Sequence, residues 1–318
     1  MADALPFGWS VRLCWDRFRR CIRSSDRPAH LPLARLPLPG RDEDEKSIRQ
    51  GRGRILAGRS SWRKCLDRTA HKVLLKRLNL VASIDSEDEA AIGALPVTIR
   101  EIEAGIDIVS EGQYVTQCCI LIDGFTYRYR HTLEGKRQII AFHVAGDIPD
   151  LHSLHMNYMD HSFAATTPAR VGFVSHEAVW DLCMRRPNVA AAMWRETLID
   201  GAIFREWIVG LGRLSGLSRT AHLLCELAMR MRAVGLAPDY VYRLPLTQHE
   251  LADALGLTVV TVNRVLKDLR ISGLVERERS RMVIRDWSGL ARLGEFDPRY
   301  LHFRVPIAMA PEAMRERA

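Results

Sequence analysis

The residues with the clearest chemistry are Asn263 and Arg264, which stand with Val260 in the segment 246–275, LTQHELADALGLTVVTVNRVLKDLRISGLV. An arginine can donate two hydrogen bonds to O6 and N7 of guanine, an asparagine can pair in the same way with adenine, and a valine offers methyl groups to thymine. These side chains could read bases only from one exposed face of a helix lying in the major groove. The residue types therefore predict base readout, provided that the surrounding sequence builds such a helix.

That surrounding sequence carries the start and stop signals of two short helices joined by a tight turn. Thr247 and Glu250 form a capping box, in which each side chain accepts a hydrogen bond from the other residue's backbone N–H. Gly256 permits the turn, Thr258 caps the second helix, and Gly273 follows its end. The order of signals predicts a helix-turn-helix. The alternative, an ordinary helical hairpin in a core, does not explain why cap, turn and exposed face all agree.

The second helix divides into a buried and an exposed face. Its apolar residues at helical spacing, which predict the buried stripe, are Val262, Val265, Leu266 and Leu269. The predicted DNA contacts within the two helices are Thr247, Gln248, Thr258, Val259, Val260, Thr261, Asn263, Arg264 and Lys267. Two of these are valines, whose exposure is hard to explain unless they meet thymine methyl groups.

Strand patterns flank the helix pair. Residues 240–244 indicate one strand before it, and residues 274–278 and 282–285 indicate two strands joined by a polar turn. We predict that Arg277, Arg279 and Arg281, near the tip of this hairpin, contact DNA phosphates, which positions a protein without reading sequence. The alternative for these arginines is a solvated hairpin face.

The order of these parts is similar to that of the Crp/Fnr family of bacterial transcription regulators, which join a cyclic-nucleotide-binding-like β-roll to a winged helix. The resemblance covers about residues 74–290 and is most specific in the winged helix. The family's recognition helix shows a Thr or Ser cap, a Glu two residues on, and an Arg four beyond the Glu. Thr258 and Arg264 match, whereas Val260 stands at the Glu position. The resemblance therefore implies DNA contact by Arg264.

The middle of the chain consists of short strand-like runs between glycine turns. The runs are residues 97–102, 106–109, 117–122, 125–131, 136–143 and 169–174. Many short strands at even spacing predict a β-roll or jelly roll. This agrees with the sensor domain that the resemblance implies.

A β-roll can hold an effector, and the resemblance suggests where. Family members that bind a cyclic nucleotide carry a Gly-Glu for the ribose and an Arg-Ser or Arg-Thr pair for the phosphate. In the corresponding stretch we expect an effector pocket that includes Asp147, Asp150, His161 and Ser162. No arginine stands at the phosphate position, and an unperturbed imidazole is mostly neutral at pH 7, so cyclic AMP is disfavoured.

The same stretch holds several histidines and aspartates. His143, His152, His155 and His161 could ligate a metal ion on a β-roll. Their spacing matches no strong metal signature, and polar loop histidines are the simpler interpretation. We therefore predict no metal site here, and we do not expect haem ligation.

The seven cysteines are Cys14, Cys21, Cys65, Cys118, Cys119, Cys183 and Cys225. Their number is odd and they form no CxxC pair, so neither a disulfide framework nor a zinc site is predicted. Iron–sulfur members of the family carry a tight N-terminal cysteine cluster and one cysteine in the β-roll. Cys14 and Cys21 match that pattern only faintly, and we expect no cluster.

A long helical pattern follows the β-roll from residue 188 to about residue 214. Its apolar stripe is Ile199, Ala202, Ile203, Glu206, Trp207, Gly210, Leu211 and Leu214. The stripe could pack on the chain's own core or on a second copy. The resemblance favours the second copy, and two-fold symmetry would place the paired recognition helices about one DNA turn apart.

Charge and composition set the N-terminal segment apart. Residues 1–72 hold 17 of the 46 Lys and Arg but only 8 of the 38 Asp and Glu, so this segment accounts for the net charge of +8. Its Arg-rich and Pro-rich composition predicts a disordered basic arm, either one that adds DNA affinity or one that is dispensable. The predicted organisation is an arm over 1–72, a β-roll over 73–186, a dimerisation helix over 187–216, a winged helix-turn-helix over 217–290 and a C-terminal tail over 291–318.

Together these observations predict an α+β protein that is a cytoplasmic, homodimeric, sequence-specific DNA-binding transcription regulator. Its expected partners are double-stranded DNA with two-fold half-sites, a second copy of itself and RNA polymerase. No catalytic nucleophile with its base can be assembled, so we do not expect an enzyme. The alternatives are a cupin-like, metal-dependent β-roll enzyme with a DNA-binding appendage, and a structural DNA binder that needs no signal. Neither a signal peptide nor a membrane-spanning run is predicted.

Overall fold

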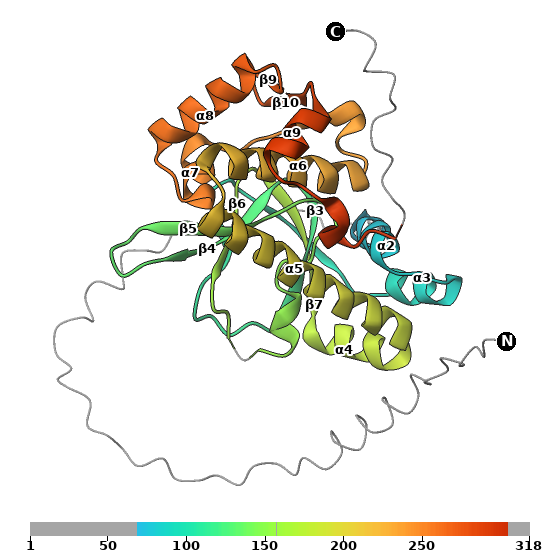
Figure 1. The fold of residues 1–318 in the computed structure, drawn as a ribbon. Helices are drawn as coiled ribbons and strands as arrows, with labels where there is room; N and C mark the ends of the chain where they lie inside the picture. Colours follow the sequence, from blue (N-terminus) through green and yellow to red (C-terminus); the bar gives the residue numbers. More distant parts are fainter. Residues whose placement is uncertain (1–68, 157, 305–318) are drawn as a thin grey trace, which may run out of the picture. The chain divides into compact units, whose positions relative to one another are not determined.

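The computed structural model describes residues 69–156 and 158–304, all within the unit Lys64–Ala318. Most of the arm expected over residues 1–72 and the end of the tail expected over residues 291–318 lie outside the described residues. Figure 1 shows helices, a β-roll, a long helix and a second region of helices and short strands, in this chain order. From the β-roll onward, this is the α+β order that the sequence predicts.

The β-roll consists of two antiparallel sheets with strand orders β1-β7-β3 and β2-β6-β4-β5. The strands are β1 (Thr98–Ile102), β2 (Asp107–Val109), β3 (Gln117–Asp123), β4 (Thr126–His131), β5 (Arg137–His143), β6 (Ser162–Ala165) and β7 (Ala169–Ser175). Phe163 of one sheet packs in a single cluster with Leu121 and Val171 of the other, and all three are fully buried. The roll therefore has its own core.

Six of these strands start and end within one residue of the predicted runs. The seventh, β6, was not predicted. All four of its residues are buried, so it lacks the alternation of apolar and polar residues that marks a half-buried strand. It also lies in the histidine-rich stretch that the sequence analysis treated as a loop.

Two helices that the sequence analysis did not predict precede the roll, α2 (Thr69–Val81) and α3 (Ser86–Gly93). In α2 the buried residues Leu74, Leu78 and Val81 follow i, i+4, i+7 spacing and pack against the rest of the unit. Helix α2 crosses the boundary that we placed at residue 72, so the structure corrects the end of the predicted arm.

The short helix η2 (Leu151–Leu154) lies between β5 and β6, and β7 leads into α4 (His176–Arg185) and α5 (Pro187–Arg213). Helix α5 is 27 residues long and confirms the predicted long helix. Its predicted apolar stripe, however, packs within the chain, since Ile199 and Ile203 belong to the chain's own core. The prediction that this stripe faces a second copy is thus corrected.

The C-terminal region confirms the winged helix-turn-helix. Its helices are α6 (Gly216–Ala233), η3 (Pro238–Tyr240), α7 (Gln248–Leu255) and α8 (Val259–Ile271), and its sheet has the order β8 (Val241–Arg243), β10 (Arg281–Ile284) and β9 (Val275–Glu278). Helix α6 buries residues on all sides, including Leu224, Leu227 and Ala228, and forms the centre of this region. The remaining elements therefore pack around α6.

The chain does not become a tail at residue 291. Helix α9 (Trp287–Leu293) crosses that boundary, and η4 (Pro298–Leu301) follows it. The ring of Tyr300 stacks on that of His222 in α6, with centroids 5.9 Å apart. The structure thus corrects the tail prediction for residues 291–301, which cover α6.

The close approach of α9 to α6 gives a first prediction. A Cβ atom at Gly294 would lie 2.5 Å from the backbone nitrogen of His222, so Gly294→Ala must push the two helices apart. We expect the free energy of unfolding to fall by about 1–3 kcal/mol in a denaturant titration. Gly93→Ala is the control, because nothing lies within 4 Å of a Cβ atom there. Equal stability of both variants would contradict the close packing.

Candidate functional site

The helix-turn-helix has the caps that the sequence predicts. Glu250 Oε2 accepts a hydrogen bond from the backbone N–H of Thr247 at 2.7 Å, and Thr247 Oγ1 accepts one from that of Glu250 at 3.1 Å. Gly256 adopts a left-handed conformation with φ of 59°, and Thr258 Oγ1 accepts from the N–H of Thr261 at 3.2 Å. The caps and the glycine turn are local signals, and they determine where α8 starts and the direction in which it leaves the turn.

The predicted reading face of α8 is exposed. Asn263, Arg264 and Lys267 lie on the surface, and Val260 is 79% exposed. The opposite stripe is buried, with Val262, Val265 and Leu269 in the core and Leu266 half-buried. Val259 is half-buried and packs against the core, so only one of the two valines expected on the surface is there. Thr247, Gln248 and Thr258 are exposed, and Thr261 is half-buried.

The wing presents two arginines at its turn. Arg279 and Arg281 are both exposed, and Arg279 has a positive φ of 56° at the tip. Arg277 instead donates to the backbone oxygen of Leu246 at 3.3 Å, which ties the wing to the start of α7. The two exposed guanidinium groups are thus available to phosphates.

The β-roll contacts the helix-turn-helix directly, a contact that no sequence signal revealed. Arg137 on β5 donates to Asp253 Oδ2 on α7 at 2.8 Å. The neighbouring Gln138 donates to the backbone oxygen of Ala254 at 3.3 Å. Strand β5 of the β-roll is therefore hydrogen-bonded to the first helix of the helix-turn-helix.

A cavity of about 280 Å³ lies where the roll, α2, α5 and α6 meet. Three buried arginines from three of these elements line it, Arg77 of α2, Arg128 of β4 and Arg230 of α6. They are far apart in sequence, and none of them stands at the family's phosphate position near residue 160, so the sequence pattern does not reveal them. Their approach to one cavity is visible only in the fold.

Each of these guanidinium groups is held by carboxylates. Arg77 lies 2.9 Å from Glu196 and Arg128 lies 2.5 Å from Asp200. Arg230 donates to Asp147 at 2.8 Å, and burial, which by itself would lower the pKa of Arg230, is outweighed by Asp147 and Glu226, so that this pKa is raised. All three arginines are therefore paired with carboxylates.

The four residues expected in an effector pocket have different places. Asp147 and His161 line the cavity. Asp150 instead accepts from the N–H of Cys119 at 2.7 Å, and burial raises its pKa to about 6. Ser162 accepts from the N–H of Glu111 at 3.0 Å. Asp150 and Ser162 thus support the roll's backbone and do not line the cavity.

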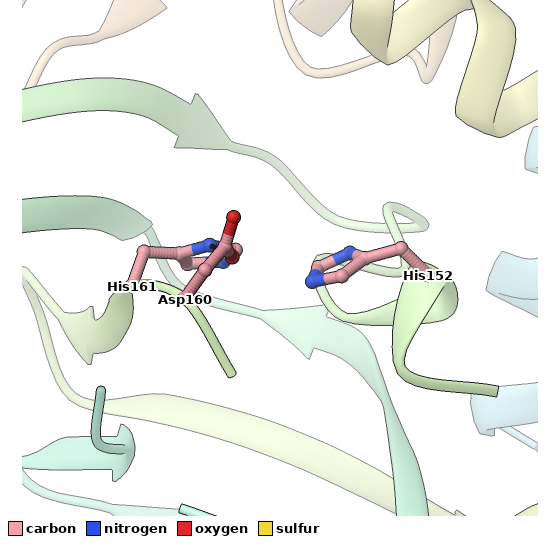
Figure 2. Close-up of side chains that lie close together, drawn as sticks. All are labelled: His152, Asp160 and His161. Atoms are coloured by element: carbon pink, nitrogen blue, oxygen red, sulfur yellow. Dashed lines mark hydrogen bonds and ion pairs between the residues drawn. The ribbon is translucent and has the colours of Figure 1, made fainter. Parts of the chain in front are cut away.

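The cavity also brings together His152, Asp160 and His161, which Figure 2 shows facing one another. The two imidazole centroids are 5.1 Å apart, and His161 Nδ1 lies 2.7 Å from Asp160 Oδ1. Burial, together with the nearby Arg128, lowers the pKa of His152 to about 4 and also lowers the pKa of His161. Both rings are therefore neutral at pH 7.

Comparison with known proteins agrees with this fold. Family models described as a cyclic nucleotide-binding domain and a Crp-like helix-turn-helix domain match residues 99–186 and 218–293. The chain is 27% identical over 206 residues to the transcriptional activator protein FnrL of Cereibacter sphaeroides, covering 64% of this chain and 82% of the relative. It is 29% identical over 206 residues to the nitrogen fixation regulation protein FixK of Azorhizobium caulinodans, covering 64% and 80%.

A solved structure gives the same result. FixK2 from Bradyrhizobium japonicum matches with a TM-score of 0.57 at 25% identity, over 63% of this chain and 98% of that one. Fold and exposed helix define a winged-helix DNA-binding protein with a β-roll sensor domain. The chain belongs to the Crp/Fnr family of transcription regulators. It is a regulator and not a metal-dependent enzyme, the alternative considered from the sequence. None of the described helices is long and apolar enough to cross a membrane.

The buried ion pairs give a second prediction. Asp147→Asn leaves the charges of Arg77 and Arg230 with less compensation in a buried site. We expect the free energy of unfolding to fall by about 3–5 kcal/mol in a denaturant titration. The control is Asp181→Asn, because its pair with Arg185 lies on the surface and should contribute less than about 1 kcal/mol. A loss no greater than that of the control would show that Asp147 is not needed.

Proposed function

We propose that this regulator binds a two-fold operator as a homodimer, that α8 of each copy reads one half-site in the major groove, and that an effector in the cavity controls this binding. The observation that carries the proposal is the exposed face of α8, where Val260, Asn263 and Arg264 stand beside one another near the helix start. A helix that enters the major groove uses its N-terminal residues to reach base edges.

Arg264 is the strongest candidate for direct readout. No hydrogen bond or ion pair holds its side chain within residues 69–156 and 158–304. It can therefore donate two parallel bonds to O6 and N7 of a guanine. Arg279 and Arg281 on the wing would hold the phosphates at the side of the groove and set the register of α8.

The apolar residues that α5 leaves exposed support a dimer. Trp194, Leu198 and Ile208 are between 57% and 69% exposed. Together with Gly201, Arg205 and Gly212 they occupy one side of the helix at alternating steps of four and three residues, the spacing with which two helices pack along their length. Arg205 is the one charged residue among these six. Packing of two such stripes would relate the two recognition helices by a two-fold axis.

The charged residues that line the cavity bear on which effector it can bind. Its lining includes three arginines, Arg77, Arg128 and Arg230, and four carboxylates, Asp147, Asp160, Glu196 and Asp200. The arginines are already paired, so no excess of positive charge is left for a cyclic phosphate. We therefore propose that cyclic AMP is not the effector. That neither haem nor an iron–sulfur cluster is bound stays a prediction from the sequence.

An effector in the cavity would touch two elements, α5 and β5, through which it could change DNA binding. Gly201 and Phe204 of α5 line the cavity, and α5 also carries the proposed dimer stripe. Ile140 and His143 of β5 line it as well, and β5 is bonded to α7. We also propose that the protein acts in the cytoplasm, where bacterial transcription takes place. As a transcription regulator it would contact RNA polymerase there.

The DNA contact leads to the third prediction. Operators are first selected from random DNA with the purified full chain, and affinity is measured by fluorescence anisotropy. We expect Arg264→Ala to weaken operator binding by about 1–3 kcal/mol and to lose discrimination at one base pair. The control is Arg270→Ala, an exposed arginine at the other end of α8, which should change affinity for operator and unrelated DNA by the same small factor. Wild-type affinity of Arg264→Ala would refute the proposed readout.

The dimer leads to the fourth prediction. The double variant Leu198→Glu, Ile208→Glu buries two charges in the proposed interface, so we expect a monomeric mass in light scattering. A monomer engages one half-site only, and operator affinity should fall by about 100-fold or more. Leu133→Glu is the control, because this leucine is fully exposed between β4 and β5. A monomeric wild type, or a double variant that remains dimeric, would show that α5 is not the interface.

A further inference from the structure

The side chains of His152, Asp160 and His161 meet at the cavity although eight residues separate the first two. Each offers one ligand atom, and the three atoms lie within 4.8 Å of one another. Figure 2 shows the imidazole of His152 directed toward the other two side chains. A movement of about 1 Å would bring such atoms to the distances of about 2.0–2.2 Å that imidazole and carboxylate ligands keep from a transition metal.

The unsatisfied polar atoms point to the same site. Nε2 of His152 and Nε2 of His161 are buried and have no hydrogen-bond partner among the described residues. The residue His161 is itself only 6% exposed. A buried nitrogen without a partner costs about 1–3 kcal/mol, so two of them facing one cavity indicate a missing ligand. A metal ion would take the lone pair that a neutral imidazole offers.

The ligand types of the cluster also suit a divalent cation. Arg128 lines the same cavity, where it pairs with Asp200 at 2.5 Å and donates to the backbone oxygen of Pro149. Arg77 and Arg230 are paired with Glu196 and Asp147. Of the cavity's carboxylates this leaves Asp160, whose partner within the described residues is the neutral His161. The cluster thus offers a metal ion two neutral imidazoles and one carboxylate, and that carboxylate is 69% exposed.

We propose that His152, Asp160 and His161 bind one divalent transition-metal ion at the cavity. Two imidazoles and one carboxylate suit ions such as Zn²⁺, Fe²⁺ and Co²⁺, and three protein ligands leave coordination positions open toward the cavity. The ion is the effector, or the group to which a small effector molecule binds. That regulatory role rests on the proposed function, whereas the binding of the metal does not.

Metal binding is tested on the full-length protein after removal of bound metal with a chelator. We expect one Co²⁺ per chain, followed by its visible absorbance, and one Zn²⁺ per chain by isothermal titration calorimetry. His152→Asn, His161→Asn and Asp160→Asn should each weaken binding by at least about 10-fold. His155→Asn is the matched control, since this histidine is in the same segment but packs against Trp180, with ring centroids 5.0 Å apart.

Folding of the variants is checked by thermal melting. An ion that binds only the folded chain raises Tm with ion concentration, so Zn²⁺ should raise the Tm of wild type and of His155→Asn but not of Asp160→Asn. Asp160 has a side chain 69% exposed, so its replacement leaves the core intact. A wild type that binds no ion, cluster variants that bind as wild type does, or a control that loses binding equally would overturn the site.

The regulatory role is measured separately as operator affinity with Zn²⁺ and with chelator. We expect at least a 5-fold difference in wild type and none in His161→Asn. An ion that binds without changing operator affinity overturns the regulatory role and leaves the metal site standing. Failure of the chain to bind any selected DNA overturns the proposed function instead, because metal binding is observed without DNA.

Discussion

The buried carboxylate of Asp147 holds together parts of the chain that are far apart in sequence. It accepts hydrogen bonds from Arg230 of α6 at 2.8 Å and from the backbone N–H of Val144 at 2.9 Å, and it lies 3.5 Å from Arg77 of α2. A guanidinium group does not lose its proton in a protein, so two buried arginines require a fixed negative charge. One carboxylate therefore fixes the relative positions of three parts of the chain. These are the turn after β5, helix α2 before the roll, and helix α6 at the centre of the DNA-binding region. The cavity exists because these three elements meet there.

Because of this arrangement, an occupant of the cavity could displace two elements, strand β5 and helix α5. Strand β5 places Ile140 and His143 at the cavity and Arg137 against Asp253 of α7, so a displacement of β5 reaches the helix-turn-helix through one hydrogen-bonded strand. Helix α5 places Ile203 at the cavity while Leu198 and Ile208 stay exposed on its outer side. An occupant that favours one position of α5 would change how two copies pack, and thus the spacing of their recognition helices. Coupling of this kind needs two arrangements with different affinities for DNA, not a rigid connection.

The sequence predicts the features that depend on neighbouring residues, such as helix caps and turns. It does not predict the features that depend on contacts between distant residues. The caps at Thr247 and Thr258 and the turn at Gly256 are local, and the structure has them as predicted. Six strands were found from their turns, whereas β6 was missed because all its residues are buried and show no alternation. Helix α5 was located correctly, but its apolar residues form two stripes, and sequence alone cannot say which packs inside. The arginines of the cavity could not be predicted at all, since Arg77 and Arg230 meet Asp147 only through the tertiary fold.

The exposed Val260 has a consequence for recognition that follows from its chemistry. The family pattern places a Glu at this position, and a carboxylate can accept a hydrogen bond from the N4 amino group of cytosine. A valine accepts none, and at 79% exposure it presents methyl groups to water in the free protein. Those methyl groups become buried on DNA only where a thymine offers its own, so apolar contact replaces a hydrogen bond at this base pair. If Arg264 and Val260 contact bases as proposed, the half-site of this regulator should keep a guanine opposite Arg264 and carry a T·A pair where a relative with Glu reads C·G.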